Sequence, residues 1–265
     1  MNQYKHFLNF GGGVNSVAYE IYLNELGIEH ESVFCDHGAD NPKTYEYVEY
    51  FNTELIKRGL KPVTIIDGKV KEKSMEKALN LMEYCEYKKT VPQRLLRWCT
   101  EKFKIIPCNE YINSKIEEGE QVYYHLGIAS DEEHRARVPQ NPAPYLRNKI
   151  FKFLFVEDGI TRADNIEMIE KAEFEVPPKS GCYICPFQPN KELRKLYLEE
   201  PCLYEKAKNL EITVNKRREL EGKGFTGIKD KPISTIVQEG QIYLDINDDG
   251  EFEWINDRKP CNCNL

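Results

Sequence analysis

The chain has 265 residues, 40% of them hydrophobic, and a formal net charge of −7, a composition typical of a globular protein without global attraction to nucleic acid. No apolar run approaches the ~20 residues of a membrane span, and the first residues lack the apolar core of a secretory signal. We therefore expect a cytoplasmic protein with no membrane partner, in which nine cysteines favour metal, cluster or catalytic sulfur over disulfides.

The first part of the chain alternates between short apolar runs and amphipathic segments. We predict a strand at 5–10, a helix at 15–26, a strand at 30–35, a helix at 42–58 with Pro42 in its first turn, and a strand at 62–66. Further helices are expected at 71–89, 100–116 and 161–171, a strand at 121–128 and an extended run at 150–156. Alternation of this kind indicates a parallel sheet with right-handed crossovers.

After this alternation the pattern changes to charged helix over 190–222 and a hairpin around the turn Asn247-Asp248-Asp249-Gly250. The predicted fold is α/β, a Rossmann-like, doubly wound, mostly parallel sheet with a smaller helical, cysteine-containing C-terminal region. We place the core at residues 1–165 and the C-terminal region at 166–265.

Three glycines followed by Asn-Ser connect the first predicted strand to the first predicted helix. Glycine lets a backbone approach a ligand closely, and a helix N-terminus presents unpaired N–H groups at the positive end of its dipole. The sequence therefore predicts a phosphate site formed by Gly11, Gly12, Gly13, Asn15 and Ser16. The alternative is a tight turn without a ligand.

Other candidate residues follow or adjoin strand ends, where open parallel sheets bind ligands. Asp36 and Gly38 follow the second strand, Gly127 closes the strand at 121–128, and Arg135 lies just beyond it, while Arg97 lies in the segment between. Asp36 could bind a ribose or Mg²⁺, or only close a turn. Arg135 could bind a phosphate, or pair with Glu132 or Glu133.

Five cysteines form the candidate metal set. Cys182 and Cys185 have C-x-x-C spacing, Cys261 and Cys263 form Cys-Asn-Cys near the C-terminal end of the sequence, and Cys99 stands alone. Together they could hold a [4Fe–4S] cluster or Zn²⁺. The other four cysteines, Cys35, Cys85, Cys108 and Cys202, are expected to be ordinary buried or semi-buried thiols.

These motifs together resemble the PP-loop ATP pyrophosphatase superfamily, in its phosphoadenosine phosphosulfate reductase-like branch. The resemblance rests on five elements in the family's order: Gly11-Gly12-Gly13-Val14-Asn15-Ser16; Asp36-His37-Gly38 with Pro42-Lys43-Thr44-Tyr45; Arg97-Trp98-Cys99-Thr100 with Lys104 and Pro107; Gly127-Ile128 with Glu132 and Arg135; and Gly181-Cys182-Tyr183-Ile184-Cys185-Pro186-Phe187. Gly11 replaces the family's first Ser, and Val14-Asn15 replaces a common Lys-Asp pair, so the loop lacks a cation and a carboxylate.

The resemblance implies an enzyme, an ATP-dependent sulfurtransferase that adenylates an acceptor with release of pyrophosphate. It implies ATP or adenylyl sulfate, Mg²⁺ and a cysteine-bound iron–sulfur or zinc centre, with Cys99 and Arg135 as catalytic residues. The acceptor would be a tRNA, a DNA or a small molecule, with a sulfur-donor protein as partner, and the chain would be a homo-oligomer or a subunit of a complex.

Two alternatives remain open at this point. Adenylyl sulfate reduction would use a terminal cysteine, although the family's usual Glu-Cys-Gly-x-His tail is absent. A nucleotide-binding module with a structural zinc and no turnover would account for the altered loop.

Overall fold

The computed structural model describes residues 4–237, 243–246 and 252–255. The chain forms two compact units: the α/β unit comprises Met1–Lys73 and Thr100–Ser180, and the second unit comprises Ser74–Cys99 and Gly181–Leu265. This division differs from the predicted one at 165/166. The α/β unit continues to Ser180 because the chain after 165 is bound to its helices: Arg58 donates hydrogen bonds to the carbonyls of Ala172 and Glu173.

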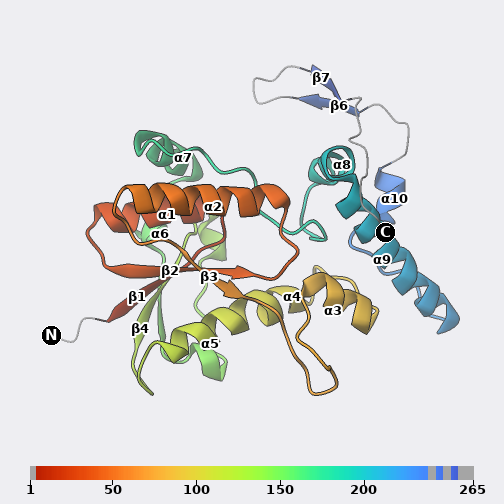
Figure 1. Ribbon diagram of the computed structural model, residues 1–265, viewed down its shortest axis with the longest axis horizontal. Coiled ribbons are helices and arrows are strands. Elements are labelled where there is room, and N and C mark those ends of the chain that lie inside the picture. The colour runs from red at the N-terminus through yellow and green to blue at the C-terminus, as the bar shows by residue number, and fades with distance from the viewer. Residues whose placement is uncertain (1–3, 238–242, 247–251, 256–265) are drawn as a thin grey trace. The chain divides into compact units, whose positions relative to one another are not determined.

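The α/β unit is built on a five-stranded sheet (Figure 1). Its strands are β1 (Lys5–Asn9), β2 (His30–Asp36), β3 (Thr64–Asp67), β4 (Val122–Leu126) and β5 (Lys149–Lys152), in the spatial order β3-β2-β1-β4-β5. All neighbouring strands are parallel, which confirms the predicted Rossmann-like α/β fold. The strand order reverses between β1 and β4, the point where such sheets bind ligands.

Helices cover both faces of this sheet (Figure 1). One face carries α1 (Val14–Glu25), α2 (Pro42–Lys57) and α7 (Arg162–Lys171), and the other carries α5 (Ile106–Ser114). Successive side chains of a strand point to opposite faces, so Leu8 packs in the core below α1 and α2, whereas Phe7 packs in the core against α5. These two cores fix the sheet between its helical layers.

The helix starts agree with the local sequence. Asn41 caps α2 by accepting a hydrogen bond from the Lys43 N–H, with Pro42 as the first helical residue. Thr161 and Asp164 form a capping box at the start of α7. The predictions for α1, α2 and α7 are therefore confirmed within one or two residues.

Two sequence predictions are wrong. The predicted helix at 71–89 is present only as α3 (Leu81–Lys88), because Asn80 and Glu83 form a capping box that starts the helix there. The extended run predicted at 150–156 ends with β5 at Lys152, and the short helix α6 (Leu154–Glu157) follows.

The predicted helix at 100–116 is interrupted. It consists of α4 (Trp98–Thr100), the π-helical segment η1 (Glu101–Ile105) and α5. Pro107 has no N–H to donate to the Phe103 carbonyl, and that carbonyl accepts a hydrogen bond from the Cys35 thiol at 3.1 Å. The proline and the buried thiol thus account for the irregular backbone.

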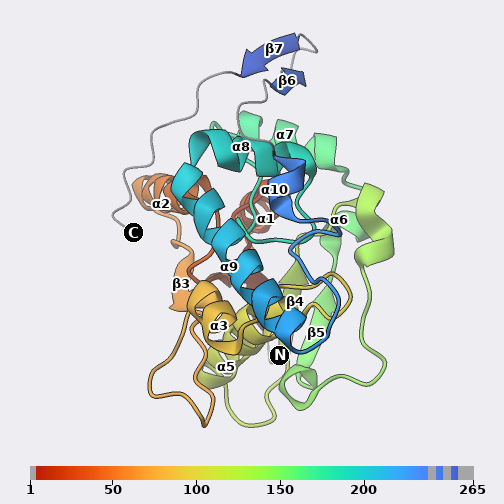
Figure 2. The same cartoon turned by 90° about the vertical axis from the view of Figure 1, so that its right-hand side faces the viewer.

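Two short 3-10 helices, η2 (Ser130–Arg135) and η3 (Pro144–Leu146), lie between β4 and β5. The second unit contains α3, α8 (Asn190–Glu199), α9 (Pro201–Leu220) and α10 (Ile233–Ile236) (Figure 2). The helix predicted at 190–222 divides because Pro201 cannot continue α8. Strands β6 (Tyr243–Ile246) and β7 (Phe252–Ile255) pair antiparallel, as predicted for the hairpin.

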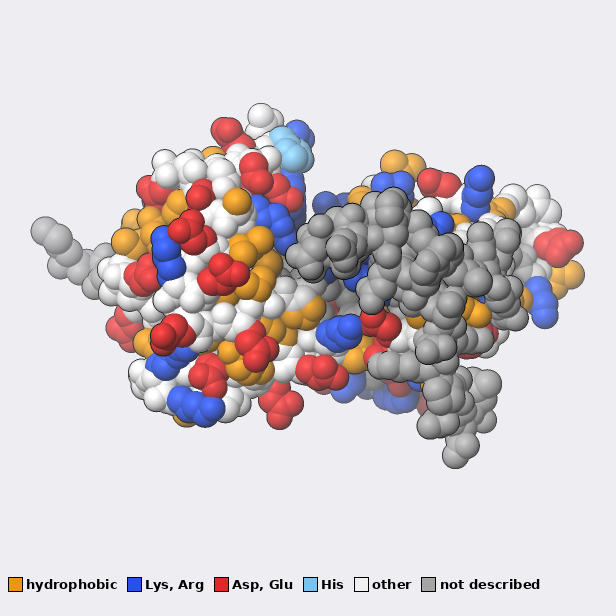
Figure 3. Space-filling view, turned by 90° about the horizontal axis from the view of Figure 1, so that it is seen from above, with side chains coloured by type: hydrophobic (Ala, Val, Ile, Leu, Met, Phe, Trp, Pro, Cys, Tyr) orange, Lys and Arg blue, Asp and Glu red, His pale blue; other side chains and the backbone are white. Residues whose placement is uncertain are grey.

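The core of the second unit lies between α8 and α9, where the rings of Tyr197 and Tyr204 meet edge to face at 5.1 Å. The buried carboxylate of Glu211 on α9 accepts hydrogen bonds from the N–H groups of Ile228 and Ile233, which fixes the following loop. Among the described residues, no helix has the length and apolar character needed to cross a membrane. Acidic, basic and apolar side chains are interspersed on the molecular face in Figure 3.

Candidate functional site at the carboxyl edge of the sheet

The glycine loop joins β1 to α1, as predicted. Gly12 has φ +70°, in the left-handed region that favours glycine, and a Cβ there would lie 3.0 Å from Cγ2 of Thr44. Gly13 is the N-cap residue of α1. The loop therefore places the positive end of the α1 dipole at the carboxyl edge of the sheet.

The Ser16 hydroxyl shapes this loop. It donates a hydrogen bond to the Gly13 carbonyl at 2.9 Å and accepts one from the Gly13 N–H at 3.2 Å. Ser16 itself is buried, and its hydroxyl forms part of the helix cap. The N–H groups of Val14 and Asn15 precede the first N–H bonded within the helix, that of Ser16.

The end of β4 meets the start of α1 at Gly127. A Cβ on Gly127 would lie 2.9 Å from the carbonyl oxygen of Asn15 and 3.3 Å from Cα of Ser16. Both are backbone atoms, so only glycine allows this approach. Gly127 and the glycine loop, which the sequence placed at the same edge, thus lie together at the switch point between β1 and β4.

Asn15 connects three elements through its side chain. Its Nδ2 donates to Oε2 of Glu132 at 3.2 Å, and its Oδ1 accepts from Arg162 at 3.3 Å and from Asn165 at 3.2 Å. The Asn15 amide therefore binds η2 and α7. The predicted contact of this side chain with a phosphate stays a prediction, and such a contact would compete with these three hydrogen bonds.

Two guanidinium groups belong to the same network. Arg135 pairs with Glu132 at 2.7 Å, the alternative that the sequence left open, and more than half of its side chain is exposed. Arg162, which is exposed, contacts Asn15, and its backbone N–H donates to Asp131 at 3.2 Å. Arg162 and Asn165 were missed in the sequence, because the capping signal at Thr161 marks the start of α7 but nothing links that turn to the glycine loop.

Two hydroxyl groups border the glycine loop. Oγ1 of Thr44 is buried and has no hydrogen-bond partner among the residues that the structure describes. A Cβ on Gly13 would lie 2.5 Å from the hydroxyl oxygen of Ser180, so this side chain covers Gly13. A buried polar atom without a partner is costly in a folded protein, and Thr44 marks a place where a bound group could supply one.

Asp36 closes a turn at the end of β2. Its Oδ1 accepts hydrogen bonds from the Gly38 N–H and the Tyr45 hydroxyl, both at 2.8 Å, and Gly38 has φ +72°. Burial and the Asp36 hydrogen bond raise the pKa of Tyr45 above its usual range. Asp36 thus closes a turn, which is the alternative to ribose or Mg²⁺ binding that was left open above.

A buried charge cluster follows this turn. Nδ1 of His37 accepts a hydrogen bond from the Ala39 N–H, which assigns the ring proton to Nε2, 3.3 Å from Oδ1 of Asp40. Lys104 lies 3.4 Å from the same oxygen. Burial alone would raise the pKa of Asp40, but Lys104 and His37 outweigh it and lower that pKa to about 2. Asp40 is thus held ionised.

The remaining candidate residues belong to the second unit. Arg97 has φ +44°, and its guanidinium lies 5.3 Å from the ring centroid of Phe187. Cys182 and Cys185 form one turn, in which the Cys185 N–H donates to the Cys182 carbonyl at 3.0 Å. Cys99 is half-buried.

The predicted metal ligands are not gathered by the described part of the chain. Cys99, Cys182 and Cys185 do not form a set whose three sulfur atoms all lie within 4.8 Å of one another. Cys261 and Cys263 lie outside the described residues. We therefore derive no reaction step through a metal or cluster.

The expectation of ordinary buried thiols is confirmed for Cys35, Cys85 and Cys108. It is wrong for Cys202, which is disulfide-bonded rather than a free thiol. The hydrogen bond with Cys108 and burial raise the pKa of Cys35, and burial followed by the charge of Cys99 raises the pKa of Cys85. Thiols held protonated in this way are poor nucleophiles.

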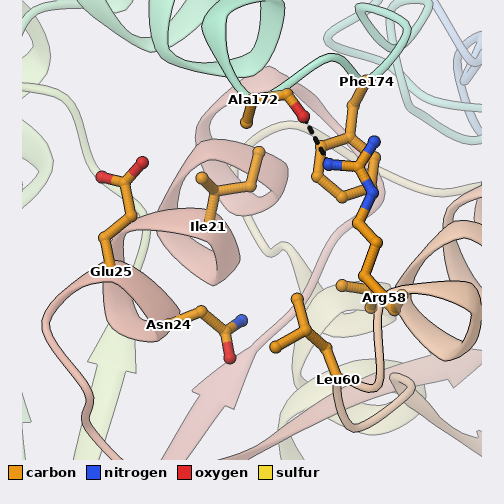
Figure 4. Close-up of a pocket in the computed structure, with 8 residues that line it drawn as sticks. Ile21, Asn24, Glu25, Arg58, Leu60, Ala172 and Phe174 are labelled. Atoms are coloured by element: carbon orange, nitrogen blue, oxygen red, sulfur yellow. Dashed lines mark hydrogen bonds between the residues drawn. The ribbon is translucent and has the colours of Figure 1, made fainter.

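A pocket of about 280 Å³ lies elsewhere in the α/β unit (Figure 4). Ile21 and Glu25 of α1 line it with Arg58, which follows α2, and Phe174, which follows α7. The Arg58 guanidinium lies 3.7 Å from the Phe174 ring centroid and donates to the Ala172 carbonyl. Arg58 thus serves to fix the end of α7, and the pocket lies at the C-terminal end of α1, away from the glycine loop.

Comparison with known proteins adds a relative but no function. No family model matches the chain. Over 211 residues it is 25% identical to the uncharacterized protein MJ0066 of Methanocaldococcus jannaschii, and the aligned part covers 76% of this chain. The chain spans 40% of the length of that protein.

Proposed function

We propose that the α/β unit binds the phosphates of an adenine nucleotide, ATP or adenylyl sulfate, at the glycine loop between β1 and α1. The observation that carries this proposal is the approach of Gly127 to Asn15, which brings the end of β4 against the start of α1 at the switch point. A side chain at Gly127 would separate the two segments.

Backbone and charge at this edge suit a polyphosphate. The N–H groups of Val14 and Asn15 precede the first hydrogen bond within α1, at the helix N-terminus, where the helix dipole favours an anion. The loop has Val14-Asn15 where the resembled family has a Lys-Asp pair, so it lacks a positive charge. Arg162 and Arg135 would supply that charge. Arg135 would exchange its Glu132 partner for a phosphate oxygen, a bidentate contact that guanidinium groups favour.

The reaction we propose is adenylyl transfer followed by sulfur transfer, with the chain acting as an ATP-dependent sulfurtransferase. An acceptor oxygen would bond to the α-phosphorus while the bond to the pyrophosphate oxygen breaks, and sulfur would then displace AMP. Charge grows on the phosphate oxygens in the first step, so loop amides, guanidinium groups and Mg²⁺ are needed to stabilise it. Sulfur would be carried as a persulfide, supplied by a sulfur-donor protein, on one of the candidate cysteines Cys99, Cys182 and Cys185. Its outer sulfur would bond to the adenylated carbon as AMP leaves, and a second of these thiols would break the resulting S–S bond. The sulfur would then remain on the acceptor, and an external thiol reductant would reduce the disulfide left on the chain. Adenylyl sulfate reduction remains an alternative use of the same nucleotide site.

One observation favours a second candidate, a nucleotide-binding module without turnover. The side chain of Asn15 is bound to Glu132, Arg162 and Asn165, and the Glu132 carboxylate adds negative charge beside the loop. With the Asn15 side chain bound in this way, the loop can hold a nucleotide through its backbone N–H groups without activating it for reaction.

Two measurements on the full chain separate these candidates. Calorimetric titration with ATP and Mg²⁺ tests binding, and release of pyrophosphate in the presence of tRNA, DNA or small-molecule acceptors tests turnover. Binding with acceptor-dependent pyrophosphate release supports the enzyme, whereas binding without release supports the module. Absence of binding overturns both.

A further inference from the structure

The second unit exposes a compact basic and apolar surface, which we term the arginine–leucine patch: Arg94, Leu95, Leu96, Arg97 and Phe187. The exposed fractions of Leu95, Leu96 and Phe187 are 97%, 69% and 50%. Apolar side chains exposed together, rather than singly, mark a surface that binds something.

Residues 94–97 of this patch form a turn whose conformation is fixed by hydrogen bonds within the second unit. The Arg97 N–H donates to the Gln93 carbonyl at 3.2 Å, and the Gln93 side chain donates to the Thr226 hydroxyl at 3.4 Å. Arg97 has φ +44°, a conformation that is unfavourable for a residue with a Cβ and persists where its surroundings impose it. The turn therefore presents its two leucines outward in a fixed arrangement.

The arginines are arranged around an aromatic ring. Their guanidinium carbons lie 5.5 Å (Arg94) and 5.3 Å (Arg97) from the ring centroid of Phe187, within cation–π range. Arg94 also lies 3.7 Å from the exposed carboxylate of Asp230, a surface pair that contributes little and is readily exchanged. Both guanidinium groups are thus able to bind phosphate beside an exposed ring.

The charge of the chain is unevenly distributed around this patch. Residues 74–99 and 181–237 contain sixteen basic residues (Lys and Arg) and eleven acidic residues (Asp and Glu). Residues 1–73 and 100–180 contain nineteen basic and twenty-six acidic residues. Residues 238–265 contain two basic and seven acidic residues. Residues 74–99 and 181–237, which carry the patch, thus have a net charge of +5, whereas residues 238–265 of the same unit have a net charge of −5. The attraction for an anionic ligand is therefore local to the arginines of the patch.

We propose that the arginine–leucine patch binds single-stranded nucleic acid. Its guanidinium groups contact backbone phosphates, the Phe187 ring stacks on a base, and Leu95 and Leu96 enter between bases as an apolar wedge. This combination of phosphate, flat ring and apolar face distinguishes a polynucleotide strand from an acidic protein. The proposal does not depend on a nucleotide in the α/β unit, and its test does not involve one.

The test is fluorescence anisotropy of the full chain, without ATP, with labelled single-stranded DNA and RNA of about 16 nucleotides, the upper end of the site sizes of single-strand-binding domains. Phe187→Leu is expected to weaken binding about tenfold, since base–aromatic stacking has that strength. Arg94→Gln and Arg97→Gln should each reduce the slope of log K against log salt by about 0.7. Leu95→Ser should weaken binding with little effect on folding, because its side chain is almost fully exposed.

Matched controls lie in the same unit. Leu220→Ser replaces another exposed leucine (90% exposed), and Lys206→Gln with Lys216→Gln removes two exposed positive charges elsewhere on α9. Both controls should bind as the parent does. The proposal is overturned if no strand binds at low salt, if duplex binds as tightly as single strands, if the controls lose as much affinity as the patch variants, or if vesicles of anionic phospholipid bind and oligonucleotides do not.

Discussion

Gly127 at the end of β4 lies against the backbone of Asn15 at the start of α1, where a Cβ would be 2.9 Å from the Asn15 carbonyl oxygen. These two residues come from segments more than a hundred positions apart in the sequence. Their approach brings the strands on either side of the switch point to one narrow edge, and a nucleotide site there depends on it.

Gly127→Ala is expected to open this edge. The added methyl group meets backbone atoms that cannot rotate away, so we expect a loss of about 1–3 kcal/mol in the free energy of unfolding. Nucleotide affinity should fall about tenfold or more, which calorimetric titration with ATP measures. Gly224→Ala is the control, because a Cβ at Gly224 meets nothing within 4 Å. Equal ATP affinity in the two variants would contradict the role of Gly127.

Arg162 tests whether α7 supplies charge to the loop. Arg162→Gln keeps a polar side chain but removes the guanidinium that contacts Asn15, and we expect ATP affinity to fall about tenfold with little change in stability. Arg147→Gln is the control, because it removes another exposed arginine of the same unit. If both variants bind ATP equally, then Arg162 only fixes α7.

Ser16→Ala separates loop shape from ligand binding. Because Ser16 caps α1 with two hydrogen bonds to Gly13, its loss should cost about 1 kcal/mol of stability and also weaken ATP binding by disordering the loop. Thermal unfolding and calorimetry measure the two effects. Unchanged ATP affinity in Ser16→Ala would count against the loop as the phosphate site.

A buried histidine makes the stability of the α/β unit depend on pH. Burial, followed by the charges of His6, His30 and Lys152, lowers the pKa of His125 to about 3. Between pH 6.5 and 3 the unfolded chain therefore binds a proton that the folded chain does not, and stability falls with decreasing pH by up to about 1.4 kcal/mol per unit. The lowered pKa of His6 acts in the same direction.

His125→Gln removes this titrating group. Below pH 6, the slope of the unfolding free energy against pH should therefore decrease by about 1.4 kcal/mol per pH unit, the amount that corresponds to one proton. Urea unfolding of parent and variant at about pH 7, 5 and 4 measures it. His30 does not cancel this effect. Burial lowers the pKa of His30, but the hydrogen bond and charge of Glu20 raise it by more, so the net pKa is raised. The stabilisation that protonated His30 contributes is therefore complete below pH 6.5 and is lost only as the pH rises. Parallel pH profiles in parent and variant would contradict the assignment.

Thiol labelling tests the division between structural and reactive cysteines. At about pH 8, iodoacetamide should modify Cys182 and Cys185, which are partly exposed, and leave Cys35 and Cys108 unmodified because they are buried. If Cys182 and Cys185 hold a metal or cluster in the purified protein, a chelator should increase their labelling without changing that of Cys35 and Cys108. Metal analysis of anaerobically purified protein identifies zinc or iron, and labelling of Cys35 as fast as Cys182 would contradict the burial argument.

Much of the α/β unit could be predicted from the sequence because its signals are local. The alternation of apolar runs with amphipathic segments gives the strands and helices, and Asn41, Pro42 and Thr161 mark helix starts within one turn. The glycines of the loop and Gly127 could be placed at one edge because parallel strands share their carboxyl ends.

The rest depends on contacts between distant segments. The sequence around Asn15 does not predict that its side-chain amide binds Glu132 and Asn165, or that Arg162 contacts the loop. The helix predicted through residues 71–80 failed because Asn80 starts α3 later, and Pro107 interrupts another helix. The second unit combines two separated stretches of chain, which periodicity cannot reveal.

The most direct test of the nucleotide site is a backbone amide NMR titration of the full chain with ATP and Mg²⁺. We predict that the largest chemical-shift changes occur at the amides of Gly12, Gly13, Val14 and Asn15, with smaller changes at Gly127. Saturable binding whose shifts gather away from this loop, or no shifts at all at millimolar ATP, would contradict the account.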